Sequence, residues 1–279
     1  MDISIAIPSS SLMETQTSKE KSLKVSFLAR SISIFRVKTV YIYNDSTYNK
    51  TSTDSTLIKT LLEFLNTPPY LRKIIYPKSD ILKYVGLLPP INSPHHPPKE
   101  SISKLKIEDI RMGVIIKDKD KAFVEIGLDT PIPISTKRKS GEKINVKIVS
   151  IKPKIEVREI QSSQIKGYWG YDVKIIKEFR SIVNSIGKQT ILLITSRHGY
   201  DFYKYEEEIK KLKTSSSEFM ILFGSPKKSV MDILKSDITV LKNLPNTYIV
   251  NMFPNQGTST VRLEEAIFGT LSILRYIYR

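Results

Sequence analysis

Five prolines between Pro89 and Pro98 divide this sequence into stretches with different hydrophobic periods. Proline fixes its own φ angle and has no backbone N–H, so this stretch cannot lie inside a helix or a central strand. Before it, and again after about residue 164, short apolar runs alternate with helix-like segments, whereas residues 109–160 contain closely spaced strand patterns. We therefore expect an α/β domain made of residues 1–92 and 164–279, with residues 93–163 inserted as a second domain.

The first α/β stretch contains two predicted strands and three predicted helices. Residues 2–7 alternate apolar with polar side chains, which suggests an edge strand, and residues 39–43 form the second strand. Helices are predicted over residues 21–35, 56–65 and 69–77, the last ended by a proline. In the first helix we expect Leu23, Phe27, Ala29, Arg30 and Ile34 on or near one face.

The inserted stretch is expected to form a small barrel of the OB type. Five short strands are predicted, over residues 111–116, 122–126, 132–134, 143–150 and 155–160. Basic residues outnumber acidic ones here, and Lys137, Arg138 and Lys139 fall on a predicted loop that could follow RNA phosphates. An ordinary solvated hairpin tip explains the same three residues.

The last stretch returns to α/β alternation and ends three apolar strands in small polar loops. Strands are predicted over residues 190–194, 219–223 and 248–250, helices over residues 173–186 and 206–212, and a final helix capped by Thr260. Ligands bind at the carboxyl ends of strands in open α/β sheets, so the three loops are expected to form one site. Gly257 is expected to let the backbone approach that ligand. An ordinary strand-to-helix loop is the alternative for this last segment.

Composition narrows the class of partner. The formal net charge of +16 favours a polyanion, with nucleic acid as the first candidate and solubility as the alternative. There is no cysteine, which excludes disulfides and cysteine-bound zinc, and His95-His96 lack a third ligand at a useful spacing, so no metal is expected. No apolar run approaches the roughly 20 residues of a membrane span, and no signal peptide is recognised. A cytoplasmic location is therefore expected.

Several short motifs together resemble those of one enzyme family. They are Ala29-Arg30, Ile34–Val37, Pro69–Arg72, Val85–Pro90, Thr195–Arg197, Phe223–Pro226, Asn255–Thr258, Thr260–Arg262 and Glu264–Ala266. In this order they resemble the SPOUT RNA methyltransferases, in particular the archaeal and eukaryotic branch with a small β-barrel inserted in the catalytic domain. The sequence departs from that pattern at Lys227-Lys-Ser229, where family members often carry a glycine.

The resemblance implies methylation of N3 of a ribosomal uridine, with S-adenosylmethionine as the methyl donor. It also implies a C-terminal trefoil knot and a homodimer. The sequence has neither a Gly-x-Gly-x-x-Gly nor a phosphate-binding ATPase motif, so other nucleotide folds are disfavoured. The expected cofactor-binding residues are Thr195, Ser196, Arg197, Gly199, Gly224, Ser225, Pro226, Asn251, Phe253, Asn255, Gln256, Gly257, Thr258 and Thr260.

Removal of the N3 proton leaves an anion that a cation can stabilise, and Arg30 is the candidate for this role. Glu265 is a carboxylate candidate. Both also have structural explanations, since Arg30 could pair with Glu264 or Glu265 and glutamates favour a first helical turn. His198 is a weaker candidate base, and Tyr168, Trp169 and Tyr171 could stack on a base or pack a domain junction.

Two other functions remain open. The methyl group could go to a ribose 2′-hydroxyl or to another base atom. Alternatively, the chain could be a non-catalytic RNA-binding factor in ribosome assembly.

Overall fold

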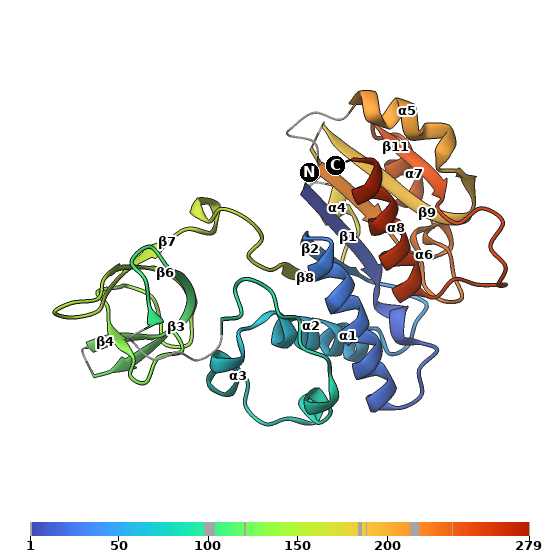
Figure 1. The fold of residues 1–279 in the computed structure, drawn as a ribbon. Coiled ribbons are helices and arrows are strands. Elements are labelled where there is room, and N and C mark those ends of the chain that lie inside the picture. Colours follow the sequence, from blue (N-terminus) through green and yellow to red (C-terminus); the bar gives the residue numbers. More distant parts are fainter. Residues whose placement is uncertain are drawn as a thin grey trace. The chain divides into compact units, whose positions relative to one another are not determined.

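The computed structural model describes residues 2–97, 104–119, 121–183, 186–187, 189–212, 218–235 and 237–278. The chain forms two compact units, and Figure 1 labels many of their helices and strands. Residues 1–63, 81–89 and 171–279 make the first unit, and residues 64–80 and 90–170 make the second. The second unit thus contains residues 64–80 as well as the whole range of the expected insertion, residues 93–163. The domain boundaries at residues 92 and 163 stay a prediction.

A six-stranded sheet forms the centre of the first unit, and every neighbouring pair of strands in it is parallel. The spatial order is β11-β9-β10-β1-β2-β8. The strands are β1 (Asp2–Pro8), β2 (Val37–Tyr43), β8 (Asp172–Ile176), β9 (Thr190–Asp201), β10 (Glu218–Leu222) and β11 (Thr247–Asn251). The mixed α/β class and the parallel sheet agree with the sequence prediction.

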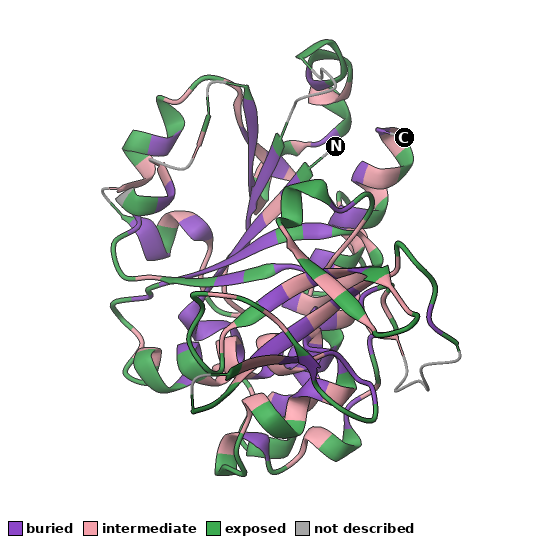
Figure 2. Ribbon diagram, turned by 90° about the vertical axis from the view of Figure 1, so that its left-hand side faces the viewer, coloured by how far each residue is buried: buried purple, intermediate pink, exposed green. Residues whose placement is uncertain are grey.

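The prediction that residues 2–7 form an edge strand is wrong. β1 pairs with β10 on one side and with β2 on the other, and Ile3, Ile5 and Ile7 are fully buried. Figure 2 shows the strands of this sheet largely in the colour of buried residues. A parallel strand covered on both faces needs few polar residues, and Ser4 is small enough to be accommodated there. The alternation of isoleucine with small residues therefore misled the prediction.

The predicted helix over residues 173–186 is also wrong in its first part. Residues Asp172–Ile176 form the edge strand β8, which pairs with β2, and the helix α4 is limited to Arg180–Val183. A short apolar run fits a strand and a buried helix equally well by its period. The β-branched residues Val173, Ile175 and Ile176 favour the strand.

The remaining helices of the first unit cover its sheet. They are α1 (Ser18–Ile34), most of α2 (Thr51–Asn66), α5 (Tyr203–Leu212), α6 (Val230–Leu234), α7 (Asp237–Lys242) and α8 (Leu263–Ile277). A short 3₁₀ turn at Ser9–Leu12 follows β1. The sequence did not predict α6 and α7. Side chains of α4, α6 and α7, including Ile182, Ile233 and Leu241, pack with Leu192 and Leu222 in one buried cluster.

Helices α1 and α8 pack side by side (Figure 1). Arg275 donates to the carbonyl oxygen of Phe35 at 2.7 Å, and the rings of Phe35 and Phe268 meet edge to face at 5.2 Å. The buried side of α1 carries Val25, Leu28 and Ile32. Of the expected apolar face, Phe27 and Ile34 point outward, 56% and 53% exposed, whereas Ala29 is fully buried.

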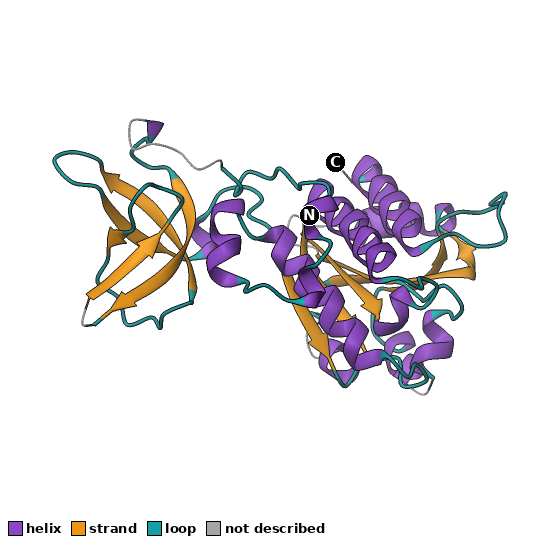
Figure 3. Ribbon diagram, turned by 90° about the horizontal axis from the view of Figure 1, so that it is seen from below, coloured by secondary structure: helices purple, strands orange, loops and turns teal. Residues whose placement is uncertain are grey.

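The second unit is built on a five-stranded antiparallel sheet, in the order β5-β4-β3-β6-β7. The strands are β3 (Ile110–Asp118), β4 (Lys121–Glu125), β5 (Ile132–Pro133), β6 (Lys143–Ser150) and β7 (Glu156–Ile160). Strands β5 and β7, at the two ends of the order, also contact each other, so the sheet nearly closes into a barrel, as Figure 3 shows. All five predicted strands are confirmed to within one or two residues, and the OB assignment remains a prediction.

Helix α3 (Pro69–Ile75) belongs to this second unit. The hydroxyl of Tyr70 donates to the carbonyl oxygen of Met112 on β3 at 2.7 Å. The ring of Tyr70 lies where a side chain at Gly127 would be, and Gly127 has a φ of +83°. A glycine is therefore required at this turn of the barrel.

Candidate functional site

A pocket of about 630 Å³ lies in the first unit, beside the middle of β9 and the carboxyl ends of β10 and β11. Its volume falls in the range of typical small-molecule sites. All three predicted loops contribute to its lining. The lining residues predicted from the sequence are Thr195, Ser196, Arg197, Gly224, Ser225, Pro226, Asn251, Phe253, Gln256 and Thr260. The predicted convergence of the loops is therefore seen, and the identity of the ligand stays a prediction.

The first loop is an excursion within the long strand β9. On β11, Ile249 faces Ile194, and the next residue, Val250, faces Tyr200. The residues between, Thr195–Gly199, have no partner on β11, which turns Thr195, Ser196, Arg197 and His198 to the pocket. Gly199 itself does not line the pocket. A Cβ there would lie 2.7 Å from the Val250 carbonyl carbon, so its glycine is needed for strand packing.

The second loop, residues 224–229, is closed by its own hydrogen bonds. The backbone N–H of Ser225 donates to the Lys228 carbonyl oxygen at 2.8 Å, and the Lys228 N–H donates to Ser225 Oγ at 3.0 Å. A Cβ at Gly224 would lie 2.6 Å from that same carbonyl oxygen. Ser229 then begins α6 through a capping box with Asp232, and its hydrogen bonds lower the pKa of that carboxyl.

The third loop, residues 251–262, is tied to the first. Arg197 Nη1 donates to the Ser259 carbonyl oxygen at 2.8 Å, and Asn251 Nδ2 donates to the Arg197 carbonyl oxygen at 3.3 Å. The ring of Phe253 packs against α8 at Gly269, where a Cβ would lie 2.5 Å from the ring. These contacts hold two walls of the pocket together.

Some expected features of the third loop are wrong or lie elsewhere. Helix α8 begins at Leu263 with Arg262 in the N-cap position, so the predicted cap at Thr260 is wrong. A Cβ at Gly257 would meet nothing within 4 Å, which means that packing within the chain does not require this glycine. The predicted cofactor residues outside the pocket lining are Gly199, Asn255, Gly257 and Thr258.

Several lining residues were not among the predicted cofactor residues, notably Lys228, Met252 and Thr270. Thr270 Oγ1 is buried and has no hydrogen-bond partner among the described residues. A buried hydroxyl without a partner costs free energy, so a ligand that bonds to it is favoured. Thr270 lies on α8 one turn beyond Ala266, in an apolar pattern that gives no sign of a polar site.

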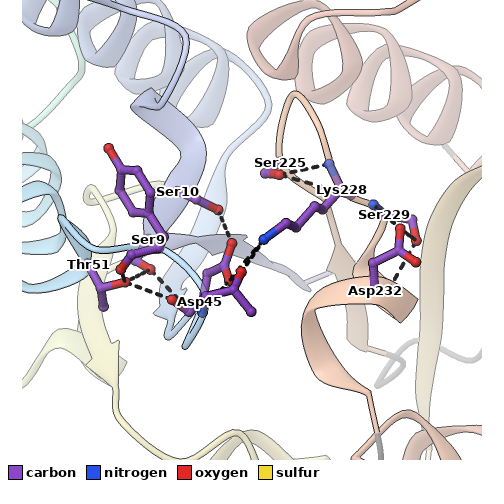
Figure 4. A network of polar contacts seen from close by, with 10 residues as sticks. Ser9, Ser10, Asp45, Thr51, Ser225, Lys228, Ser229 and Asp232 are labelled. Carbon is purple, nitrogen blue, oxygen red and sulfur yellow. Dashed lines mark hydrogen bonds and ion pairs between the residues drawn. The ribbon is translucent and has the colours of Figure 1, made fainter.

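A polar network adjoins the pocket, at the ends of β1 and β2 (Figure 4). Its centre is Asp45, 1% exposed, which follows β2. Asp45 accepts hydrogen bonds from Ser10 Oγ at 2.7 Å and from Thr47 Oγ1 at 2.6 Å, and its backbone N–H donates to Ser9 Oγ at 2.9 Å. Burial alone would raise the pKa of Asp45, but the hydrogen bonds and nearby Lys228 lower it.

The two predicted catalytic residues lie outside the pocket lining. Arg30 is half-buried on the outward side of α1, between Phe27 and Ile34. Glu265 is exposed and accepts from the Arg262 backbone N–H at 2.9 Å, as a residue in a first helical turn does. Glu264 forms an ion pair with Lys24 of α1 at 3.3 Å.

The predicted RNA-binding residues lie in the second unit. Arg138 is engaged by Glu159 at 2.9 Å and by Glu142 at 3.4 Å, whereas Lys137 and Lys139 are exposed. Their role stays a prediction.

The histidine pair and the aromatic residues have structural contacts. The Nε2 atoms of His95 and His96 both lie within 2.9 Å of the Asn66 carbonyl oxygen. Trp169 Nε1 donates to Asn145 Oδ1 at 2.7 Å, and the Tyr171 hydroxyl donates to the Leu62 carbonyl oxygen at 2.9 Å. These contacts agree with packing roles. In the described part of the chain, no three His, Asp or Glu side chains are grouped as a metal site would need.

Comparisons with known proteins cover nearly the whole chain. A family model described as "Putative RNA methyltransferase" matches residues 2–274. A Drosophila melanogaster protein named 28S rRNA (uridine-N(3))-methyltransferase is 26% identical over 98% of this chain and 61% of its own length. A human protein of the same name is 23% identical over 77% of its length, and an uncharacterized Haloarcula marismortui protein is 24% identical over 99% of its length. Among the described residues, none of the helices is both long and apolar enough to cross a membrane.

Proposed function

Because the chain belongs to the family described as "Putative RNA methyltransferase", we propose that it methylates N3 of a uridine in ribosomal RNA. The observation that carries this proposal is the match of almost the whole chain to relatives named 28S rRNA (uridine-N(3))-methyltransferase. The net charge of +16 is in keeping with an RNA substrate.

The pocket fits S-adenosylmethionine as the methyl donor. Its volume of about 630 Å³ falls in the range of sites for small molecules such as this donor. The buried Thr270 hydroxyl, which has no hydrogen-bond partner among the described residues, could bond to a polar group of the donor. When bound, the donor supplies an electrophilic methyl group on a sulfonium. The backbone groups of the three loops, with Thr195, Asn251 and Gln256, would hold it.

We further propose a SPOUT-type knot in this unit and a homodimer. The exposed faces of α1 and α8 support the dimer, because Phe27, Ile34, Phe268 and Tyr276 are between 48% and 73% exposed there. Arg30 lies on the same outward side of α1 and outside the pocket of its own chain. A catalytic Arg30 would therefore act on the pocket of a second copy.

A nucleoside analysis tests the function. The purified protein is incubated with S-adenosylmethionine and ribosomal RNA lacking the modification, and the digested RNA is analysed by mass spectrometry. We expect 3-methyluridine in proportion to the enzyme. A 2′-O-methylated nucleoside, or another methylated base, would instead support the rival enzyme activities. Tight RNA binding without donor binding in a calorimetric titration would indicate the non-catalytic assembly factor.

A further inference from the structure

Lys228 lies where the pocket meets the polar network of Asp45. It lines the pocket, and its ammonium lies 4.0 Å from Asp45 Oδ1 (Figure 4). The ammonium also hydrogen-bonds to Thr47 Oγ1. Asp45 and Thr47 follow β2, whereas Lys228 follows β10. Because β1 lies between β10 and β2 in the sheet, the Lys228 side chain links two loops that follow the strands on either side of β1.

The geometry indicates that Asp45 orients Lys228 and does not depend on it. The Asp45 carboxylate already accepts hydrogen bonds from Ser10 and from both the N–H and the hydroxyl of Thr47. Asp45 is almost fully buried, while 33% of the Lys228 side chain is exposed. An ammonium has three donors, and among the described residues the structure assigns one of them, to Thr47. Lys228 thus keeps donors that can reach a ligand.

The position of Lys228 favours the methyl acceptor over the donor. Two of the three loops expected to hold the donor, residues 195–199 and 251–260, lie at the β9 and β11 side of the sheet, and the third, residues 224–226, directly precedes Lys227 and Lys228 on the loop after β10. Lys228 reaches toward the opposite side, at β1 and β2. A cation fixed at this edge faces the space in which the acceptor base must approach the methyl group.

We propose that Lys228, held by Asp45 and Thr47, donates a hydrogen bond to a carbonyl oxygen next to N3 of the target uracil and so stabilises the ring anion. This inference rests on the proposed uridine-N3 methyl transfer. The N3 proton passes to solvent, and the negative charge spreads over the two ring carbonyl oxygens. The N3 lone pair then forms the bond to the methyl carbon, while the electron pair of the broken carbon–sulfur bond stays on sulfur. A preorganised donor at the oxygen lowers the barrier to this step.

Single-turnover methyl transfer by Lys228→Met tests the inference, with Lys38→Met as the matched control. Lys38 also pairs with an aspartate, Asp2 at 3.0 Å, at the opposite ends of β1 and β2. At saturating donor and RNA we expect the Lys228→Met rate at pH 7 to fall roughly a hundredfold or more, the effect of losing one preorganised donor. Lys228→Arg should retain part of the rate, and Lys38→Met should match the wild type.

The pH dependence separates this role from a structural one. With the stabilising cation removed, the rate should depend more steeply on hydroxide, so the defect of Lys228→Met should shrink as the pH rises. Calorimetry should give a donor Kd within about threefold of wild type, and the melting temperature should be unchanged. If Lys228→Met is unstable, the pH dependence of the methyl-transfer rate is measured on Asp45→Asn instead. We expect its rate to fall less than that of Lys228→Met, with the same decrease of the defect at higher pH.

Three outcomes would overturn the inference and leave the proposed function standing. The first is a normal rate of 3-methyluridine formation by folded Lys228→Met. The second is a defect confined to donor affinity, which would place Lys228 at the donor. The third is a loss of RNA affinity with a shallower salt dependence and a normal rate on bound RNA, which indicates a phosphate contact. A wild-type product other than 3-methyluridine would instead overturn the proposed function, and this inference with it.

Discussion

At the scale of single residues, the sequence predicted most of the residues that line the pocket but not the reason for each glycine near it. Gly224 was expected at the pocket and lines it. The place that a Cβ would take there is occupied by the Lys228 carbonyl group of the same loop. Gly257 was expected to be needed for close approach, and nothing in the chain approaches it. Residue type and position relative to a strand end can be read from sequence. Which backbone group fills the space beside a glycine depends on how the chain folds back, and the residue pattern does not record this.

The two glycines Gly199 and Gly257 should respond differently to the same substitution. Gly199→Ala places a methyl group against the backbone of β11, so we expect a loss of roughly 1–3 kcal/mol in the free energy of unfolding. Gly257→Ala meets open space, and its stability should stay within about 0.5 kcal/mol of wild type. Urea unfolding of both variants measures this difference. Equal stabilities would contradict the close packing described between β9 and β11.

The buried hydroxyl of Thr270 should contribute to the affinity for the donor and not to the stability of the fold. Thr270→Val keeps the side-chain shape and removes a hydroxyl without a described partner, so the melting temperature should stay the same or rise. Donor affinity should weaken about tenfold, which corresponds to about 1.4 kcal/mol. Calorimetric titration with S-adenosylmethionine measures it. Thr190→Val is the control, because that buried hydroxyl accepts from the Gly187 N–H and lies outside the pocket. An unchanged Kd for Thr270→Val would remove this hydroxyl from the donor site.

At the scale of elements, period 2 predicted the barrel strands well because each has one buried and one solvated face. The same method failed at β1 and β8. In the parallel sheet of the first unit, burial depends on the helices above and below, and the local pattern does not record them. For α1 the pattern predicted an apolar face, and the structure leaves its two largest members at the outer side, Phe27 and Ile34, exposed.

The loop holding His95 and His96 should make the second unit sensitive to acid. Burial lowers the pKa of His95, and burial together with His95 lowers that of His96 to about 4. Both rings are neutral when folded, so the stability they confer is fully present above pH 6.5 and is lost as the pH falls toward 4. Melting curves between pH 7.5 and 4.5 should show a decline that is shallower in His95→Gln/His96→Gln. The His198→Gln control removes a histidine from the pocket wall and should follow the wild type. A parallel decline in all three proteins would assign the acid sensitivity to other groups.

At the scale of the whole molecule, the α1–α8 face predicts a dimer. Light scattering should give twice the 31.9 kDa of one chain. Phe27→Asp/Ile34→Asp should give a folded monomer, because both side chains are already exposed. Ile107→Asp, at a residue 58% exposed in the second unit, is the matched control and should stay dimeric. A wild-type protein that is monomeric at micromolar concentration and fully active would refute this prediction.

Mixed dimers test whether Arg30 serves the pocket of a second copy. Arg30→Lys keeps the charge and loses the planar fork of the guanidinium, and its homodimer should be at least roughly a hundredfold slower. Gly224→Val should block the pocket by displacing the Lys228 carbonyl group. A mixture of the two variants forms one site with an intact pocket and an intact Arg30 only if Arg30 acts between chains. Recovery of about a quarter of the wild-type activity is then expected on statistical grounds, and no recovery would place Arg30 within its own chain.

The pairing of β1 with β10 also sets an order of events during synthesis. β1 can pair with β2 soon after both are made, but Asp2 faces Glu218, so β1 must wait for more than 200 further residues before its second neighbour, β10, exists. The barrel strands are neighbours along the chain and can pair while the ribosome is still elongating, because local contacts form faster than distant ones. One edge of β1, the strand that carries the fully buried Ile3, Ile5 and Ile7, would stay unpaired meanwhile, which makes this part of the growing chain a natural client for chaperones.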